Sequence, residues 1–194
     1  MSRSRLIAAG TIGNVLEWYD FSIYGFFALQ IGATFFPSGD RVAEALAAFS
    51  VFAVGYLARP LGAIAIGHFG DRAGRPAALT LSILCMVIPT LGMALLPGHA
   101  TIGVAAPILL TLLRLLQGIA VGGESAIANV FMVEQAPTGR RALSSAIGGV
   151  GYAIGIQLAS LVALACASSM TPGDLQAWGW RIPFWLSLDR KSVV

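Results

Sequence analysis

Charged side chains that interrupt long apolar runs are the residues in this sequence best suited to chemistry. Glu17 and Asp20 interrupt the apolar run 6–36, and Arg114 interrupts the run 102–134. A buried carboxylate near an arginine can switch its charge when a substrate occupies that arginine. The fork of the arginine can bind a substrate carboxylate with two hydrogen bonds. These residue types therefore indicate proton movement and the binding of a carboxylate.

The composition places these charges in a polytopic membrane protein, with the lipid bilayer as its surroundings. Of the 194 residues, 57% are hydrophobic and only 11% are charged, and the mean hydropathy is +0.80. Soluble domains carry roughly 25% charged residues. The net charge of +3 comes from loop arginines without a basic stripe, and we expect no nucleic-acid partner. No cofactor is expected either. Cys85 and Cys166 lie inside apolar runs and are expected to be small core residues.

Six membrane spans are predicted, because every apolar run but the last is long enough to cross a bilayer as a helix. They form an N-terminal transmembrane bundle over residues 1–188, with spans at about 6–36, 43–66, 76–96, 102–134, 142–168 and an incomplete 182–188. Arginines gather in the segments expected to be cytoplasmic, which places the N-terminus in the cytoplasm and the chain in the cytoplasmic membrane. Trp178, Trp180 and Trp185 are expected at the membrane interface.

The first span carries its polar residues within roughly a third of the helix circumference. These residues are Gly10, Gly13, Asn14, Glu17, Asp20 and Tyr24. Two carboxylates that faced lipid would be costly, so this face is expected to look into protein or a water-filled cavity. Glu17 lies about eleven residues into the span, or ~16 Å, which is near the midplane. In the alternative interpretation the span starts later and Glu17 lies at an interface.

Two further spans carry arginines. In the second span, Pro60 is expected to bend the helix, and Arg59 either extends toward the cytoplasm or pairs with a buried acid. The sequence leaves that choice open. The fourth span places Arg114, Gln117, Glu124 and Ser125 on one narrow face. A structural ion pair between Arg114 and a first-span acid is the simpler interpretation, and it is compatible with a functional pair.

The stretch Gly67–Arg75 is the dense cluster of charge and glycine between the second and third spans. It is expected to be a tight cytoplasmic loop in which the glycines allow close approach and positive φ. Asp71 is expected to cap a helix start or to pair with an arginine. The members of this motif are Gly67, Gly70, Asp71, Arg72, Gly74 and Arg75. A simpler interpretation is an ordinary hairpin whose arginines only mark the cytoplasmic side.

Small residues line the fifth span. Gly151, Gly155 and Ala159 follow at intervals of four and predict a helix-packing face. No proline falls between Ala142 and Ser168.

Several of these motifs resemble one transporter family. Gly67–Arg75 resembles the signature loop between helices two and three of the major facilitator superfamily, although Pro76 departs from the usual basic residue. Gly13–Gly25 resembles the first-helix signature of the metabolite:proton symporter branch, whose members carry proline and betaine, α-ketoglutarate, citrate or shikimate. Arg114–Glu124 and Gly179–Phe184 resemble the same branch. The resemblance implies an all-α membrane protein, the N-terminal six-helix bundle of a major facilitator fold, truncated within helix six.

The resemblance also implies a function, a secondary transporter that couples a small polar metabolite to proton entry. The absence from the fifth span of the glycine-proline signature of antiporters favours symport or uniport. The residues expected to line the cavity are Glu17, Asp20, Tyr24, Asn14, Arg114, Gln117, Glu124 and Arg59. The implied partners are a small-molecule substrate, protons and a missing C-terminal half. A non-transporting membrane sensor and an inactive fragment remain alternatives. An intramembrane enzyme is disfavoured, since His68 and His99 are expected in loops on opposite sides of the membrane.

The last six residues, Asp189–Val194, are expected to be foreign to this protein. They are polar, and they interrupt the sixth span after seven residues. The codons GAT CGG AAG AGC GTC GTG TAG encode this tail and a stop, and they match one frame of a common sequencing adapter. A natural frameshift is the alternative. The nucleotide sequence around codon 189 decides between the two.

Overall fold

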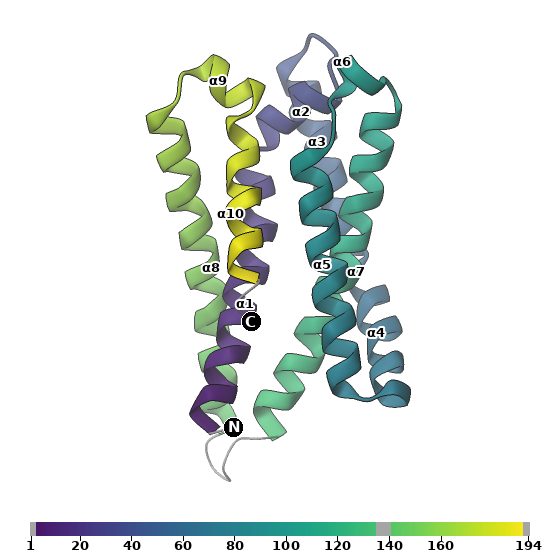
Figure 1. The fold of residues 1–194 in the computed structure, drawn as a ribbon, viewed down its shortest axis with the longest axis vertical. Helices are drawn as coiled ribbons and strands as arrows, with labels where there is room; N and C mark the ends of the chain where they lie inside the picture. Colours follow the sequence, from purple (N-terminus) through teal and green to yellow (C-terminus); the bar gives the residue numbers. More distant parts are fainter. Residues whose placement is uncertain (1–2, 135–140, 192–194) are drawn as a thin grey trace.

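The fold is all-α throughout residues 3–134 and 141–191, which a computed structural model describes. The helices in chain order are α1 (Arg3–Phe26), α2 (Ala28–Phe35), α3 (Arg41–Leu57), α4 (Arg59–Ala73), α5 (Arg75–Leu95), α6 (His99–Ile102), α7 (Ala105–Glu134), α8 (Arg141–Ser169), α9 (Pro172–Ala177), a 3₁₀ turn η1 (Gly179–Arg181) and α10 (Ile182–Lys191). The long helices form one upright bundle (Figure 1). The N-terminus and the turn between α4 and α5 lie at one end, and α2, α6 and α9 lie at the other.

Two of the expected spans are interrupted helices. The first is broken at Phe27, yet the backbone hydrogen bonds cross the break from Phe27 to Ile23 (3.2 Å) and from Ile31 to Phe27 (2.9 Å). The second is broken at Ala58, directly before Arg59-Pro60, which agrees with the bend predicted at Pro60. Helices α1 and α2 therefore continue in one direction with a local change of axis, and so do α3 and α4.

Three helical stretches in the described ranges are long and apolar enough to cross a membrane: Arg41–Ala73, Ala105–Gly123 and Gly149–Ser169. A shorter apolar stretch covers Thr80–Leu95. Large apolar side chains point outward from these segments, as in Leu57, Ile64 and Leu164, which are 75%, 71% and 65% exposed. An apolar outer surface suits contact with lipid.

The prediction of a loop over Gly67–Arg75 was wrong. Residues 67 to 73, including His68, form the last two turns of α4, and α5 starts at Arg75. Gly74 alone connects the two helices, with φ at 91°, a conformation that favours glycine. The N-cap residue of α5 is Gly74, which makes no side-chain cap hydrogen bond, and capping by Asp71 stays a prediction. Gly67 and Gly70 are thus accommodated inside α4, and among the described residues of this stretch positive φ is needed at Gly74 alone.

Glycines bring the second and fourth spans into backbone contact. A Cβ added to Gly118 in α7 would lie 1.9 Å from the carbonyl oxygen of Gly55 in α3. A Cβ on Gly62 in α4 would lie 1.9 Å from the carbonyl oxygen of Ile119, and one on Gly122 would lie 2.0 Å from that of Arg59. Only glycine permits such an approach. The contact fixes α3 and α4 against α7, and with them the backbones of Arg59 and Arg114.

The predicted small-residue face of the fifth span packs α8 against α1. A Cβ on Gly155 would lie 2.4 Å from the carbonyl oxygen of Val15, and Ala159 is fully buried. The packing prediction is confirmed, since this face sets the distance between α8 and the helix that carries Glu17 and Asp20.

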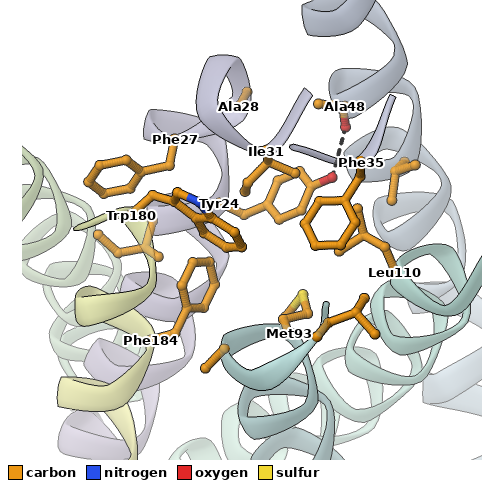
Figure 2. Close-up of a cluster of buried hydrophobic side chains, with 14 of the residues drawn as sticks. Tyr24, Phe27, Ala28, Ile31, Phe35, Ala48, Met93, Leu110, Trp180 and Phe184 are labelled. Carbon is orange, nitrogen blue, oxygen red and sulfur yellow. Dashed lines mark hydrogen bonds between the residues drawn. The ribbon is translucent and has the colours of Figure 1, made fainter. Parts of the chain in front are cut away.

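An aromatic cluster fills the bundle where α1, α2, α5, α7 and α10 meet (Figure 2). Trp180 lies edge-on to Phe35 and Phe184, with ring centroids 5.9 and 6.1 Å away. Trp180 is 1% exposed and packs inside the protein, whereas Trp178 and Trp185 are about half exposed. The expected position of the three tryptophans at the membrane interface stays a prediction. The 3₁₀ turn η1 directs Trp180 inward. Cys166 is buried and Cys85 half-buried, and both are free, as expected.

Candidate functional site

The polar residues predicted from the sequence meet on the inner faces of α1 and α7. Asn14, Glu17 and Asp20 are 8%, 1% and 1% exposed, and Arg114 and Gln117 are 0% and 1% exposed. The predicted polar face of α1 is therefore buried from Asn14 to Tyr24, whereas the burial of Gly10 and Gly13 lies outside the described part. The side chain of Glu124 lies outside the described part of the chain.

Arg114 is held by three helices. Its Nη2 donates to the carbonyl oxygen of Phe21 in α1 (3.2 Å), and its Nη1 donates to Oε1 of Gln117. Nε2 of Gln117 donates in turn to Oγ1 of Thr90 in α5 (3.2 Å). The guanidinium also lies 4.2 Å from the ring centre of Tyr24. This network fixes the orientation of the one fully buried arginine among the described side chains.

The side chain of Arg59 points into the bundle and does not extend along α4 toward the predicted cytoplasmic end. Its guanidinium lies 4.2 Å from the ring centre of Phe21, 4.5 Å from Tyr56 and 5.0 Å from Trp18. Its Nε and Nη2 have no hydrogen-bond partner among the described residues. Arg114 also contacts Phe21, at 4.6 Å, so one aromatic ring touches both cations. Arg59 is thus half-buried among aromatic rings, and its electrostatic interaction with Glu17 favours the interpretation in which it pairs with a buried acid.

Each buried acid has an arginine as a neighbour of opposite charge. Glu17 interacts electrostatically with Arg59, and Asp20 interacts with Arg114. Asp20 also accepts a hydrogen bond at Oδ1 from Oγ of Ser187 in α10. Charges removed from water in this way are costly unless they are paired. The arrangement can exchange protons or anions, because altering one member leaves its partner uncompensated.

Sequence reasoning missed several residues that build this site. Phe21 and Ser187 look like ordinary apolar-run residues, and no local pattern distinguishes them. Gly118 and Gly122 carried a usable signal, since two glycines four residues apart are typical of close helix contacts in membranes.

The charged motif at 67–75 lies away from this cluster. Asp71 and Arg72 are exposed at the end of α4, which Figure 1 places at the same end of the bundle as the N-terminus. The side chain of Arg75 lies outside the described part. Within the described residues, no group of three or more His, Cys, Asp or Glu side chains is placed to hold a metal ion.

Known proteins similar to this chain are transporters, not enzymes. A family model described as "Sugar (and other) transporter" matches residues 6–189. The shikimate transporter of Escherichia coli (strain K12) is 44% identical over 190 residues, covering 97% of this chain and 43% of that protein. The citrate-proton symporter of Salmonella typhi is 39% identical over 176 residues, covering 91% and 41%. The chain thus spans less than half the length of these curated relatives.

A solved structure shows the same fold. The xylose transporter XylE from E. coli, in a partially occluded inward open conformation, matches with a TM-score of 0.80 at 20% identity. The match covers 97% of this chain and 49% of that one. The bundle is therefore similar to about half of a complete transporter fold.

Proposed function

Because the chain belongs to the sugar (and other) transporter family of the major facilitator superfamily, we propose that it forms the N-terminal half of a proton-coupled metabolite symporter. The partners of this half are then protons, a small-molecule substrate and a second helical bundle. In transporters built from repeats, the substrate site lies near the bilayer midplane between the repeats. Such a site takes part of its lining from the inner face of α1 and α7.

The observation that carries the proposal is the burial of two acids beside two arginines. Glu17 and Asp20 are each 1% exposed within a bundle whose outer surface is apolar. Ionisable residues inside membrane proteins are costly and mark proton or substrate paths. A carboxylate paired with an arginine can take up a proton when a substrate draws the arginine away. This sequence of events couples substrate binding to protonation.

The substrate class follows from Arg114 and from the relatives. Shikimate and citrate, named in those relatives, both carry carboxylates. Arg114 presents a planar fork that binds a carboxylate with two hydrogen bonds. We propose that a carboxylate of the substrate replaces Gln117 or Asp20 as the partner of Arg114, with Glu17, Tyr24, Asn14, Arg59 and Glu124 around the cavity.

The proposed orientation of the bundle in the membrane rests on the basic residues at one of its ends. Arg72 lies at the same end as the N-terminus, which supports a cytoplasmic position for both in the cytoplasmic membrane. We propose that Gly67, Gly70, Asp71, Arg72, Gly74 and Arg75 hold the cytoplasmic ends of the helices together during transport.

Uptake by the full gene product in proteoliposomes tests the proposed function. The assay imposes an acidic exterior and offers shikimate, citrate, α-ketoglutarate, proline and betaine in turn. At least one is expected to accumulate against its gradient, and a protonophore is expected to abolish that accumulation. Uptake that ignores the proton gradient contradicts symport. Binding without any uptake supports a sensor instead.

A further inference from the structure

Helix α10 is tied to α1 by hydrogen bonds on two successive turns. The hydroxyl of Tyr19 donates to the carbonyl oxygen of Pro183 (3.2 Å), and Oγ of Ser187 donates to Oδ1 of Asp20. Pro183 and Ser187 are four residues apart and therefore lie on one face of α10. Ser187 and Asp20 are each 1% exposed, so their contact is shielded from solvent.

Among the described helical serines, Ser187 and Ser82 direct their hydroxyls to another helix, Ser82 to the carbonyl oxygen of Ala120 in α7 (3.0 Å) and Ser187 to a carboxylate. Serine and threonine in helices commonly donate to the carbonyl four residues earlier. Ser50, Thr90 and Thr111 do so, at 2.8 Å each. For Ser187 that carbonyl belongs to Pro183, which already accepts from Tyr19. The hydroxyl of Ser187 is thereby available to reach across to α1.

The Ser187 hydroxyl contacts an acid, Asp20, that also interacts with the cation of Arg114. Asp20 interacts with Arg114 of α7, and Arg114 lies near Arg59 of α4 and Tyr24 of α1. An ionised carboxylate accepts a stronger hydrogen bond than a neutral acid does. Neutralising Asp20 therefore weakens the tie to α10 as well as the attraction to Arg114.

We propose that Ser187 is a positioning residue that orients the Asp20 carboxylate and links its charge to the packing of α10 against α1. This inference rests on the proposed function, in which Asp20 takes part in proton coupling. Through this contact, protonation of one acid alters the interaction of α1 with two helices, α7 and α10. Protonation of Asp20 then acts directly on the packing of α10, which contains the sixth span, and not only through substrate binding.

A small cavity beside Ser187 makes the inference testable by conservative substitution. The cavity of about 50 Å³ is lined by Ser187, Tyr19 and Leu186 together with Val15, Leu158 and Val162. Its volume accommodates the additional methyl group of threonine. Ser187→Thr keeps the hydroxyl, Ser187→Ala removes it, and Ser187→Cys keeps the size with a weak donor.

The test compares proton-driven accumulation with substrate counterflow in proteoliposomes that hold the full gene product. Counterflow exchanges substrate without net proton movement, so it separates coupling from folding and binding. We expect Ser187→Ala to accumulate about tenfold less substrate than the parent protein, the effect of losing a hydrogen bond to a charged group. Counterflow is expected to stay within about twofold of the parent, and Ser187→Thr is expected to restore accumulation.

Matched variants make each outcome decisive. Ser50→Ala, which removes an exposed hydroxyl bonded within its own helix, is expected to behave as the parent. If Ser187→Ala does not insert, Ser187→Cys decides, with the same expected loss. The inference is overturned if the decisive variant accumulates substrate as the parent does, if accumulation and counterflow fall equally, or if threonine fails to restore accumulation.

Asp20→Asn separates the role of Ser187 from the role of Asp20 in proton coupling. If Asp20→Asn loses accumulation while Ser187→Ala behaves as the parent, only the inference about Ser187 is refuted. If Asp20→Asn accumulates substrate as the parent does, both the role of Asp20 in proton coupling and the inference about Ser187 are refuted. If uptake by the parent protein does not depend on the proton gradient, the proposed symport is refuted.

Discussion

Two regions of the bundle are equally buried but are built from opposite chemistry. The aromatic cluster contains Phe35, Trp180 and Phe184, each at most 1% exposed. The charged cluster contains Asp20 and Arg114, also at most 1% exposed. Tyr24 belongs to both, because its hydroxyl donates to the carbonyl oxygen of Ala48 (3.1 Å) and its ring lies against Arg114. Figure 2 shows that hydroxyl reaching Ala48.

From this difference we assign fold stability to the aromatic cluster and propose a role in transport for the charged cluster. Aromatic rings stabilise the fold through packing and buried area. Buried ion pairs often contribute nothing net, because desolvation offsets their attraction. A bundle selected for stability alone has no need of the second cluster. We therefore expect substitutions in the aromatic cluster to reduce the amount of folded protein, and substitutions in the charged cluster to reduce coupling.

The largest expected effect on stability is that of Trp180→Ala. Removing the buried indole leaves a cavity against Phe35 and Phe184 and is expected to cost about 4 kcal/mol. Thermal unfolding in detergent measures the loss. The protein that does insert is expected to keep the parent ratio of accumulation to counterflow. A changed ratio would show that the aromatic cluster takes part in coupling.

Gly118→Ala is expected to damage both regions at once. Its Cβ would overlap the carbonyl oxygen of Gly55 at 1.9 Å and force α7 away from α3, at a cost of about 3 kcal/mol. Gly149→Ala is the matched control, since its Cβ would meet nothing within 4 Å. Size-exclusion profiles of both variants measure the folded fraction. Equal profiles would contradict the close backbone contact.

Gln117→Leu is expected to have a smaller effect on stability and a large one on transport. It removes the acceptor of Arg114 and the link to Thr90, at a cost of about 2 kcal/mol. Uptake per inserted molecule is expected to fall at least tenfold, because Arg114 loses its orientation. Thr111→Val in the same helix, whose hydroxyl bonds its own helix, serves as control. Parent-like uptake in Gln117→Leu would remove the network from the mechanism.

Asp71→Asn has the smallest expected effect on stability, below about 0.5 kcal/mol, because Asp71 is exposed. It is nevertheless expected to slow transport more than Arg3→Ala does, if the motif holds the cytoplasmic helix ends together. Initial uptake rates measure both variants. Equal and small effects would reduce the motif to a marker of membrane topology.

The sequence predicted the helical class, most helix ranges and the buried face of α1, because apolar length and helical periodicity are local properties. It did not predict that α4 extends through the charged motif, since the three glycines suggested a longer turn than the single residue Gly74. The inward position of Trp180 depends on the turn η1, which has no local signature. The contact of Ser187 with Asp20 joins residues 167 positions apart, which periodicity cannot reveal.

The central claim, that the buried acids of α1 couple protons to transport, is tested most directly by Asp20→Asn and Glu17→Gln. Proton-driven accumulation and counterflow are measured for each variant in the full gene product, in proteoliposomes of matched protein content. At least one variant is expected to lose accumulation while counterflow persists, because an amide cannot take up the proton. Parent-like accumulation in both variants would contradict the claim.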